Sequence, residues 1–339
     1  MTTQPLSPLT MLLSRHTRRR EFITLLGGAA AWPRAARGQQ AGKVYRLGVL
    51  ATATSSIDNI RSVTLPELAK AGFIEGQNLI VDARAGTGAQ TPELAQALVA
   101  GNPDAIIGVS DVVIGALKAA SNSVPIVMSF AGSDPVAAGF AASIMRPAGN
   151  ITGVVTLASE LNAKRLTLLH EAIPTARRIA ALTVSEQRYE VSLQALRAVA
   201  ASEGFDLQIF FAEPRSAYPA AFTAMRSAGA DALIIVSAPE YNRDADILAA
   251  LAVEAKLPTV CEWSHMAVQG CLFGYGPSQP ELRRRTADYL VRIFRGAAPG
   301  DLPIEGPTRF DFTVNLKTAK RLGVELPTGL LLRADEVIE

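Results

Sequence analysis

Cysteine and histidine are scarce in this sequence. Its 339 residues include two cysteines, Cys261 and Cys271, and three histidines. The nucleophile motif GxSxG, the zinc motif HExxH and a phosphate-binding glycine loop are all missing. The two cysteines and His265 lack the spacing of metal ligands. The sequence therefore favours binding over catalysis, and we expect no enzymatic activity, no cofactor and no metal site.

Long apolar runs and long basic runs are also missing after residue 40. A helix needs about 20 apolar residues to span a bilayer, and no segment of the main body offers them. Residues 1–38 carry six arginines and one glutamate, whereas the rest carries 27 basic and 30 acidic side chains. A weakly acidic body is poorly suited to nucleic acid, so we expect no nucleic-acid partner.

The N-terminal segment has the features of an export signal. Arg18, Arg19 and Arg20 precede an apolar run of residues 23–32, and small residues follow up to Gly38. A basic segment, a short apolar run and small residues at a cut site are typical of a secretory signal. The Arg-Arg-x-Phe-Ile pattern resembles the twin-arginine motif. We expect residues 1–38 to be a signal peptide cleaved near Gly38, and the mature protein to be periplasmic.

Strands and helices alternate from residue 44 onward. The apolar, strand-like runs are continuous rather than alternating, which indicates parallel sheets buried on both faces. The sequence therefore predicts an α/β fold with two doubly wound, Rossmann-like lobes that join near residues 153–160. Expected strands are 45–50, 79–83, 105–109, 126–130 and 151–155, then 178–183, 207–211, 232–236, 258–260 and 272–275. Expected helices include 57–71, interrupted by Pro66, as well as 135–143, 160–172, 186–203, 241–256 and 280–295.

Polar and aromatic residues gather at the predicted carboxyl ends of the strands. Ligands of open α/β sheets bind at these ends, next to helix N-termini. We therefore predict a ligand site from Thr54, Ser55, Ser110, Asp111, Phe130, Asp134, Ser185, Tyr241, Glu262, Trp263 and Tyr275.

Three residue roles stay open at this point. Asp111 either caps the helix that it begins or meets a donor on the ligand. Trp263 is either a wall of the site or a packing residue. The two cysteines are either a disulfide, which an oxidising compartment permits, or buried thiols.

Several ordered motifs resemble the ABC-transporter substrate-binding family that includes tryptophan- and tyrosine-binding importer components. They cover nearly the whole mature chain: RLGVL at 46–50, GFIEGQNL at 72–79, SDPV at 133–136, PAGNITG at 147–153, KRL at 164–166, YGPS at 275–278, NLKTAK at 315–320 and LLRADEVI at 331–338. The sequence departs from the family at strand ends, where it carries the acids Asp111 and Glu262. These acids favour a ligand with a positive or donor-rich group.

The resemblance implies a periplasmic-binding-protein type I fold with two lobes and a three-stranded hinge. Lobe 1 would comprise residues 44–153 and 277–325, and lobe 2 with the hinge residues 154–276 and 326–339. It implies a monomeric receptor that captures a small solute, such as an amino acid or aromatic acid, for an ABC permease and its ATPase in the inner membrane. A ligand-sensing receptor subunit of a signalling system and a periplasmic hydrolase are the alternatives.

Overall fold

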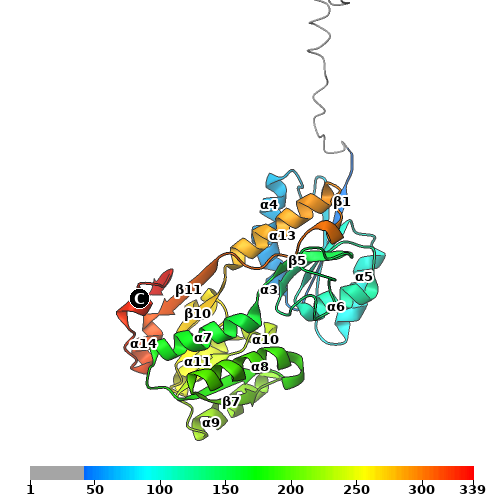
Figure 1. Cartoon of the computed structure of the whole chain (residues 1–339). Helices are drawn as coiled ribbons and strands as arrows, with labels where there is room; N and C mark the ends of the chain where they lie inside the picture. Colours follow the sequence, from blue (N-terminus) through cyan, green and yellow to red (C-terminus); the bar gives the residue numbers. More distant parts are fainter. Residues whose placement is uncertain (1–41) are drawn as a thin grey trace, which may run out of the picture. The chain divides into compact units, whose positions relative to one another are not determined.

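The computed structural model describes residues 42–339, except for the side chains at positions 159, 187, 188 and 191 (Figure 1). The predicted export signal lies outside the described residues. Val44–Glu339 form one compact unit that contains two β-sheets.

The first sheet has five parallel strands in the order β2-β1-β3-β4-β5. Its strands are β1 (Tyr45–Ala51), β2 (Leu79–Ala85), β3 (Ala105–Val109), β4 (Ile126–Ala131) and β5 (Ile151–Val155). Every residue of β3 and β5 is buried, which explains their uninterrupted apolar sequences. Its helices are α3 (Thr54–Asn59), α4 (Leu65–Lys70), α5 (Gln90–Ala100) and α6 (Asp111–Ala120).

A π-helical turn, η1 (Ile60–Thr64), joins α3 to α4 just before Pro66. Proline has no N–H to donate, so the regular hydrogen-bond ladder is interrupted there. The predicted interruption of this helix at Pro66 is confirmed.

The predicted helix at 135–143 is wrong. Residues 135–139 form turns instead, in which Asp134 accepts hydrogen bonds from the N–H groups of Val136 and Ala137. Gly139 then has a φ of +71°, outside the helical range, so the turn cannot extend.

The second sheet has seven strands in the order β12-β11-β10-β9-β8-β6-β7, all parallel except for the β10–β11 pair. They are β6 (Arg178–Thr183), β7 (Asp206–Phe211), β8 (Ala232–Ile235), β9 (Thr259–Cys261), β10 (Phe273–Pro277), β11 (Phe310–Asn315) and β12 (Glu336–Ile338). The helices are α7 (Ala158–Ala172), α8 (Glu186–Glu203), α9 (Tyr218–Ser227), α10 (Pro239–Arg243), α11 (Ala245–Glu254), α12 (Ser264–Val268), α14 (Leu316–Leu322) and α15 (Thr328–Leu331). Short 3-10 turns are η2 (Arg215–Ala217) and η3 (Pro299–Asp301).

The chain passes between the two sheets three times: after β5, after β10 and before β11. After the second crossing, α13 (Gln279–Phe294) packs beside α4 on the first sheet, although the two helices lie about 200 residues apart (Figure 1). Leu282, Leu290 and Phe294 of α13 belong to the first sheet's core. The predicted first-lobe segment 277–325 is therefore divided, because β11 is a strand of the second sheet and α14 packs in that sheet's core.

Cys261 and Cys271 form a disulfide that joins the end of β9 to the residues before β10. Both cysteines are buried. The structure thus selects the disulfide over the two free thiols.

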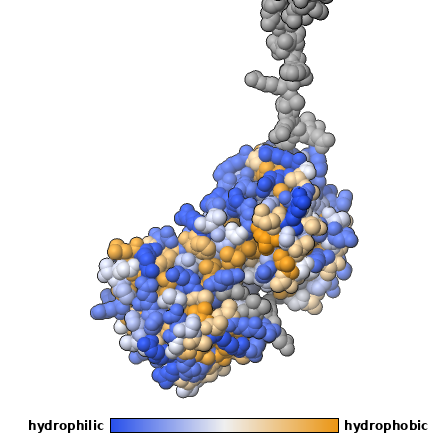
Figure 2. All heavy atoms as spheres, viewed as in Figure 1, coloured by the Kyte–Doolittle hydropathy of each residue, from blue (hydrophilic) through white to orange (hydrophobic). Residues whose placement is uncertain are grey.

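On the surface seen in Figure 2, hydrophilic residues surround small groups of hydrophobic ones. None of the helices within residues 42–339 is both long and apolar enough to cross a membrane.

Candidate ligand-binding site

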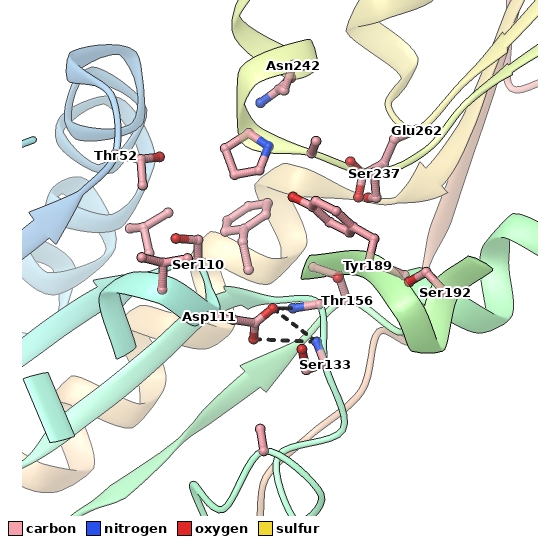
Figure 3. Close-up of a pocket in the computed structure, with 18 of the residues that line it drawn as sticks. Thr52, Ser110, Asp111, Ser133, Thr156, Tyr189, Ser192, Ser237, Asn242 and Glu262 are labelled. Carbon is pink, nitrogen blue, oxygen red and sulfur yellow. Dashed lines mark hydrogen bonds between the residues drawn. The ribbon is translucent and has the colours of Figure 1, made fainter. Parts of the chain in front are cut away.

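A cavity of about 590 Å³ is lined by residues that follow the strands of both sheets (Figure 3). The first sheet and its loops contribute Thr52, Ser56, Ser110, Asp111, Phe130, Ser133 and Asp134. The second contributes Tyr189, Glu190, Ser192, Ser237, Asn242, Glu262 and Trp263, and α13 adds Gln279 and Arg283. Parallel sheets place their ligand sites at this end.

Six of the eleven predicted site residues line this cavity: Ser110, Asp111, Phe130, Asp134, Glu262 and Trp263. The structure places the other five, Thr54, Ser55, Ser185, Tyr241 and Tyr275, outside the lining. Thr54 and Ser55 point to solvent from the first turn of α3, while Thr52 and Ser56 on either side line the cavity. Ser185 precedes α8 as its N-cap residue.

Tyr241 and Tyr275 pack elsewhere because a strand end does not determine the direction of a side chain. Tyr241 is 1% exposed, and its hydroxyl donates to the carbonyl of Ala212 at 3.0 Å. The ring of Tyr275 stacks on Phe310 of the neighbouring strand, with centroids 6.0 Å apart.

Asp111 fixes the loop that follows β4. Its Oδ2 accepts hydrogen bonds from the backbone N–H groups of Gly132 at 3.1 Å and Ser133 at 3.2 Å (Figure 3). Burial raises the pKa of Asp111, and these donors oppose the rise. Ser110, and not Asp111, is the N-cap residue of α6. The Asp111 carboxylate instead holds the backbone of residues 132–133.

Two non-glycine residues of the lining have left-handed backbone angles. Ser110 has a φ of +84° and Phe130 a φ of +58°. Such conformations are costly for residues with a Cβ, and they concentrate at functional sites. Ser110 follows β3 and Phe130 is the last residue but one of β4, and both line the cavity.

Glu262 is a buried residue of the cavity lining, and the charge of Arg165 from α7 acts on it from the interior. Arg165 is fully buried; its Nε donates to the carbonyl of Tyr275 at 2.7 Å and its Nη1 to Asn162 at 2.8 Å. Burial raises the pKa of Glu262, while the Arg165 charge and side-chain hydrogen bonds with Ser237 and Trp263 lower it. Burial in turn lowers the pKa of Arg165 to about 10, against the opposing attraction of Glu262. The two charges thus compensate each other in the interior.

Two glycines of β10 let this strand pass the backbone of Glu262 and Trp263. A Cβ on Gly274 would lie 2.2 Å from the Trp263 carbonyl oxygen, and one on Gly276 would lie 2.1 Å from that of Glu262. Only glycine avoids these clashes. Gly276 belongs to the Tyr-Gly-Pro-Ser motif, and Gly274 directly precedes it. Both glycines therefore help to place Glu262 and Trp263 at the cavity.

An aromatic and cationic stack forms one wall of the cavity. Phe130 and Trp263 meet edge to face with ring centroids 5.6 Å apart, and the Arg283 guanidinium lies 4.5 Å from the Phe130 centroid. Trp263 is only 4% exposed and also belongs to the second sheet's core. It is thus both a wall of the cavity and a packing residue.

Three buried polar atoms of the lining have no hydrogen-bond partner within the described part of the chain: Ser110 Oγ, Asn242 Oδ1 and Arg283 Nη1. Buried polar groups are usually paired, so these atoms are available to a ligand. Within residues 42–339, no group of three or more His, Cys, Asp or Glu side chains is arranged to hold a metal ion.

Sequence reasoning missed several lining residues, notably Tyr189, Ser237, Asn242 and Arg283. Arg283 is the first of three consecutive arginines, which on a helix resemble a solvated face. Tyr189 lies inside α8 at a kink, where its φ is −123°. No local pattern marks either of them, because their place depends on how the sheets and α13 pack.

Two α/β sheets with a partly apolar cavity at their facing strand ends define a two-lobed solute-binding protein. The chain belongs to the ABC transporter substrate binding protein family, which it matches over residues 49–338. It is a substrate-binding component of an ABC transporter, as the sequence motifs predicted. A tyrosine-binding protein from Clostridioides difficile is 23% identical over 279 residues, covering 80% of this chain and 78% of that protein.

Solved structures show the same fold. A conserved domain protein from Vibrio cholerae has a TM-score of 0.81 at 25% identity, covering 87% of this chain and 100% of that one. An ABC domain from Streptococcus pneumoniae, solved with L-Trp, has a TM-score of 0.79 at 22% identity over the same shares. The predicted family and fold class are confirmed.

Proposed function

We propose that this protein captures a small organic solute in the cavity between its two sheets, outside the cytoplasm, and delivers it chemically unchanged to an ABC permease and its ATPase. The observation that carries the proposal is the cavity itself: about 590 Å³, lined from both sheets, with an aromatic wall and a few buried polar atoms free to orient a ligand. Small-molecule sites have this composition.

The ligands of related proteins support a solute with an apolar or aromatic part. One relative is named as a tyrosine-binding protein, and the pneumococcal structure contains L-Trp. A solute-binding protein from Rhodopseudomonas palustris, with a TM-score of 0.54 at 15% identity, was solved with 3,4-dihydroxybenzoic acid. Amino acids and aromatic acids are accordingly the first compounds to test.

We further propose that the three chain crossings act as a hinge and that the monomeric protein closes around its ligand. The first lobe would comprise residues 44–153 with α13, and the second the seven-stranded sheet with its helices. Closure would bring the groups at both sets of strand ends onto one solute.

Ligand binding is expected to stabilise and compact the protein recovered from the periplasm. A solute at 100 times its dissociation constant should add about 2.7 kcal/mol to the free energy of unfolding. The measurement is a thermal-shift screen of amino acids and aromatic acids, followed by small-angle scattering with each hit. The radius of gyration should fall on binding. An unchanged radius with a tightly bound solute would contradict closure, and the lack of any binding solute would contradict the proposed function.

Export is the second expectation, and it rests on the basic and apolar segment of residues 1–38. The Cys261–Cys271 disulfide supports an oxidising compartment. N-terminal sequencing of the periplasmic protein should begin at or near Gln39, and replacing Arg19 and Arg20 by lysine should retain the chain in the cytoplasm. Recovery of the wild-type chain only in the cytoplasm with Met1 intact would contradict export.

A further inference from the structure

Arg283 is a buried cation that faces the cavity from α13. It is 6% exposed and lines the cavity together with Gln279, one helical turn before it. Its backbone carbonyl accepts a hydrogen bond from the hydroxyl of Thr64 at 3.4 Å, which ties this turn of α13 to the first sheet's helices. The backbone of this turn is therefore fixed beside the first sheet, and the guanidinium itself lies over the Phe130 ring.

The part of the chain that the structure describes pairs no carboxylate with this guanidinium. Nη1 is buried without a hydrogen-bond partner, and no carboxylate of the described residues lies within 4 Å of the group. Burial alone lowers the pKa of Arg283 to about 10, so the group stays protonated at neutral pH. The nearby titratable group is His265, whose own pKa is lowered by burial and by Arg283.

Other arginines of this protein show the contrast. The next two residues, Arg284 and Arg285, form ion pairs with Glu281 and Glu305. Arg165, which is also buried, has hydrogen bonds to Tyr275 and Asn162 and the attraction of Glu262. A buried charge without a partner is costly, so its retention in a cavity wall points to a partner that arrives from outside.

The acids of the cavity are already engaged. Asp111 accepts from the N–H groups of Gly132 and Ser133, and Asp134 from those of Val136 and Ala137. Glu262 has hydrogen bonds with Ser237 and Trp263 and the charge of Arg165. Glu190 accepts a hydrogen bond from Nε2 of Gln194 at 3.0 Å. Each acid of the lining thus has a hydrogen-bond donor within the described residues, whereas Nη1 of Arg283 has no acceptor there.

We infer that the solute carries a carboxylate that pairs with the Arg283 guanidinium, while its apolar or aromatic part lies against Phe130 and Trp263. The planar guanidinium fork matches the two oxygens of a carboxylate. The guanidinium lies 4.5 Å from the Phe130 centroid, so a carboxylate that pairs with it would lie close to this ring. This inference rests on the proposed function and assigns Arg283 as the residue that selects for organic acids.

The test compares pairs of probes that differ in the carboxylate: L-tyrosine with tyramine, L-tryptophan with tryptamine, and 4-hydroxybenzoate with phenol. Calorimetric titrations of the wild type should detect binding of acids and no binding of their decarboxylated partners. Arg283→Gln should weaken the binding of an acid about 10- to 100-fold, since it removes a charge-assisted hydrogen-bonding group. Arg283→Lys should recover part of the affinity, because it restores the charge without the fork.

Arg284→Gln is the matched control, because Arg284 pairs with Glu281 and does not line the cavity. It should bind acids as the wild type does. The ligand-free Arg283→Gln protein should melt at the wild-type temperature or above, since a buried unpaired charge has been removed. A fall of several degrees would show that Arg283 is a structural cation and would overturn the inference.

Small molecules released by denaturing the purified wild-type protein, identified by mass spectrometry, provide a test without a chosen probe. Release or binding of carboxylates supports the inference. Binding of neutral or cationic solutes alone, or full affinity of Arg283→Gln for an acid, would overturn it and leave the proposed function standing. A wild-type protein that binds no organic solute would contradict the proposed function and this inference with it.

Discussion

Replacing Arg165 by methionine is expected to lower the free energy of unfolding by about 3–5 kcal/mol. The substitution keeps much of the apolar volume but removes the charge that compensates Glu262 in the interior. It also leaves the Tyr275 carbonyl and the Asn162 side chain without their donor. Losing one partner of a buried pair of charges is more costly than losing both, so the remaining carboxylate causes most of the effect. Chemical denaturation of wild type and variant measures it.

The pH dependence of this loss identifies its cause. Burial raises the pKa of Glu262 in the folded state. The stability that the protonated side chain contributes is therefore fully present below the pKa of the unfolded chain, and it is lost as pH rises through the pKa of the folded protein. Removing Arg165 raises that pKa further. The deficit of Arg165→Met relative to wild type should therefore be smaller at about pH 5 than at about pH 7.5.

A double-mutant cycle with Glu262→Gln supplies the control. The Arg165→Met and Glu262→Gln double variant should regain about 1–3 kcal/mol relative to the sum of the single effects, because neither charge is then left alone. Strict additivity of the two substitutions, or a deficit independent of pH, would contradict the coupling of these charges.

Replacing Trp263 by alanine is expected to reduce both stability and affinity. The indole is buried in the second sheet's core, so its loss should lower the free energy of unfolding by about 3–5 kcal/mol. It also forms the cavity wall with Phe130, so an aromatic solute should bind about 1–3 kcal/mol more weakly. Thermal melting and calorimetric titration of the same variant separate the two effects.

Tyr241→Phe is the matched control for Trp263→Ala. Tyr241 is buried in the same core but does not line the cavity, and its hydroxyl donates to the Ala212 carbonyl. Its loss should cost about 1–3 kcal/mol of stability and leave affinity unchanged. If Trp263→Ala binds an aromatic solute as tightly as the wild type, Trp263 is a packing residue only.

The two effects at Trp263 follow from the position of the cavity. Trp263 follows β9 at the boundary between the cavity and the second sheet's core. Its side chain therefore belongs to both. The β10 glycines at 274 and 276 keep this stretch close to the sheet. A change at either glycine would displace Glu262 and Trp263 together.

The local structure of this protein was largely predictable from its sequence. Strands 105–109 and 151–155 and helix 186–203 have the predicted bounds, because continuous apolar runs and helical periodicity are short-range properties. The expected helix at 135–143 failed because Asp134 and Gly139 favour turns, a competition that apolar periodicity does not reveal.

The sequence by itself determined the α/β class, the family and the strand ends at which the cavity lies, since each depends on residue order along short segments. Only the tertiary structure decided which side chains reach the cavity, the pairing of Cys261 with Cys271 and the division of residues 277–325 between the sheets. The end of a strand determines the position of a residue but not the direction of its side chain, so Tyr241 and Tyr275 do not line the cavity. Arg283 lies over the ring of Phe130, although the two residues are more than a hundred positions apart in the sequence. That Nη1 of Arg283 has no hydrogen-bond partner among residues 42–339 is visible only in the packed structure.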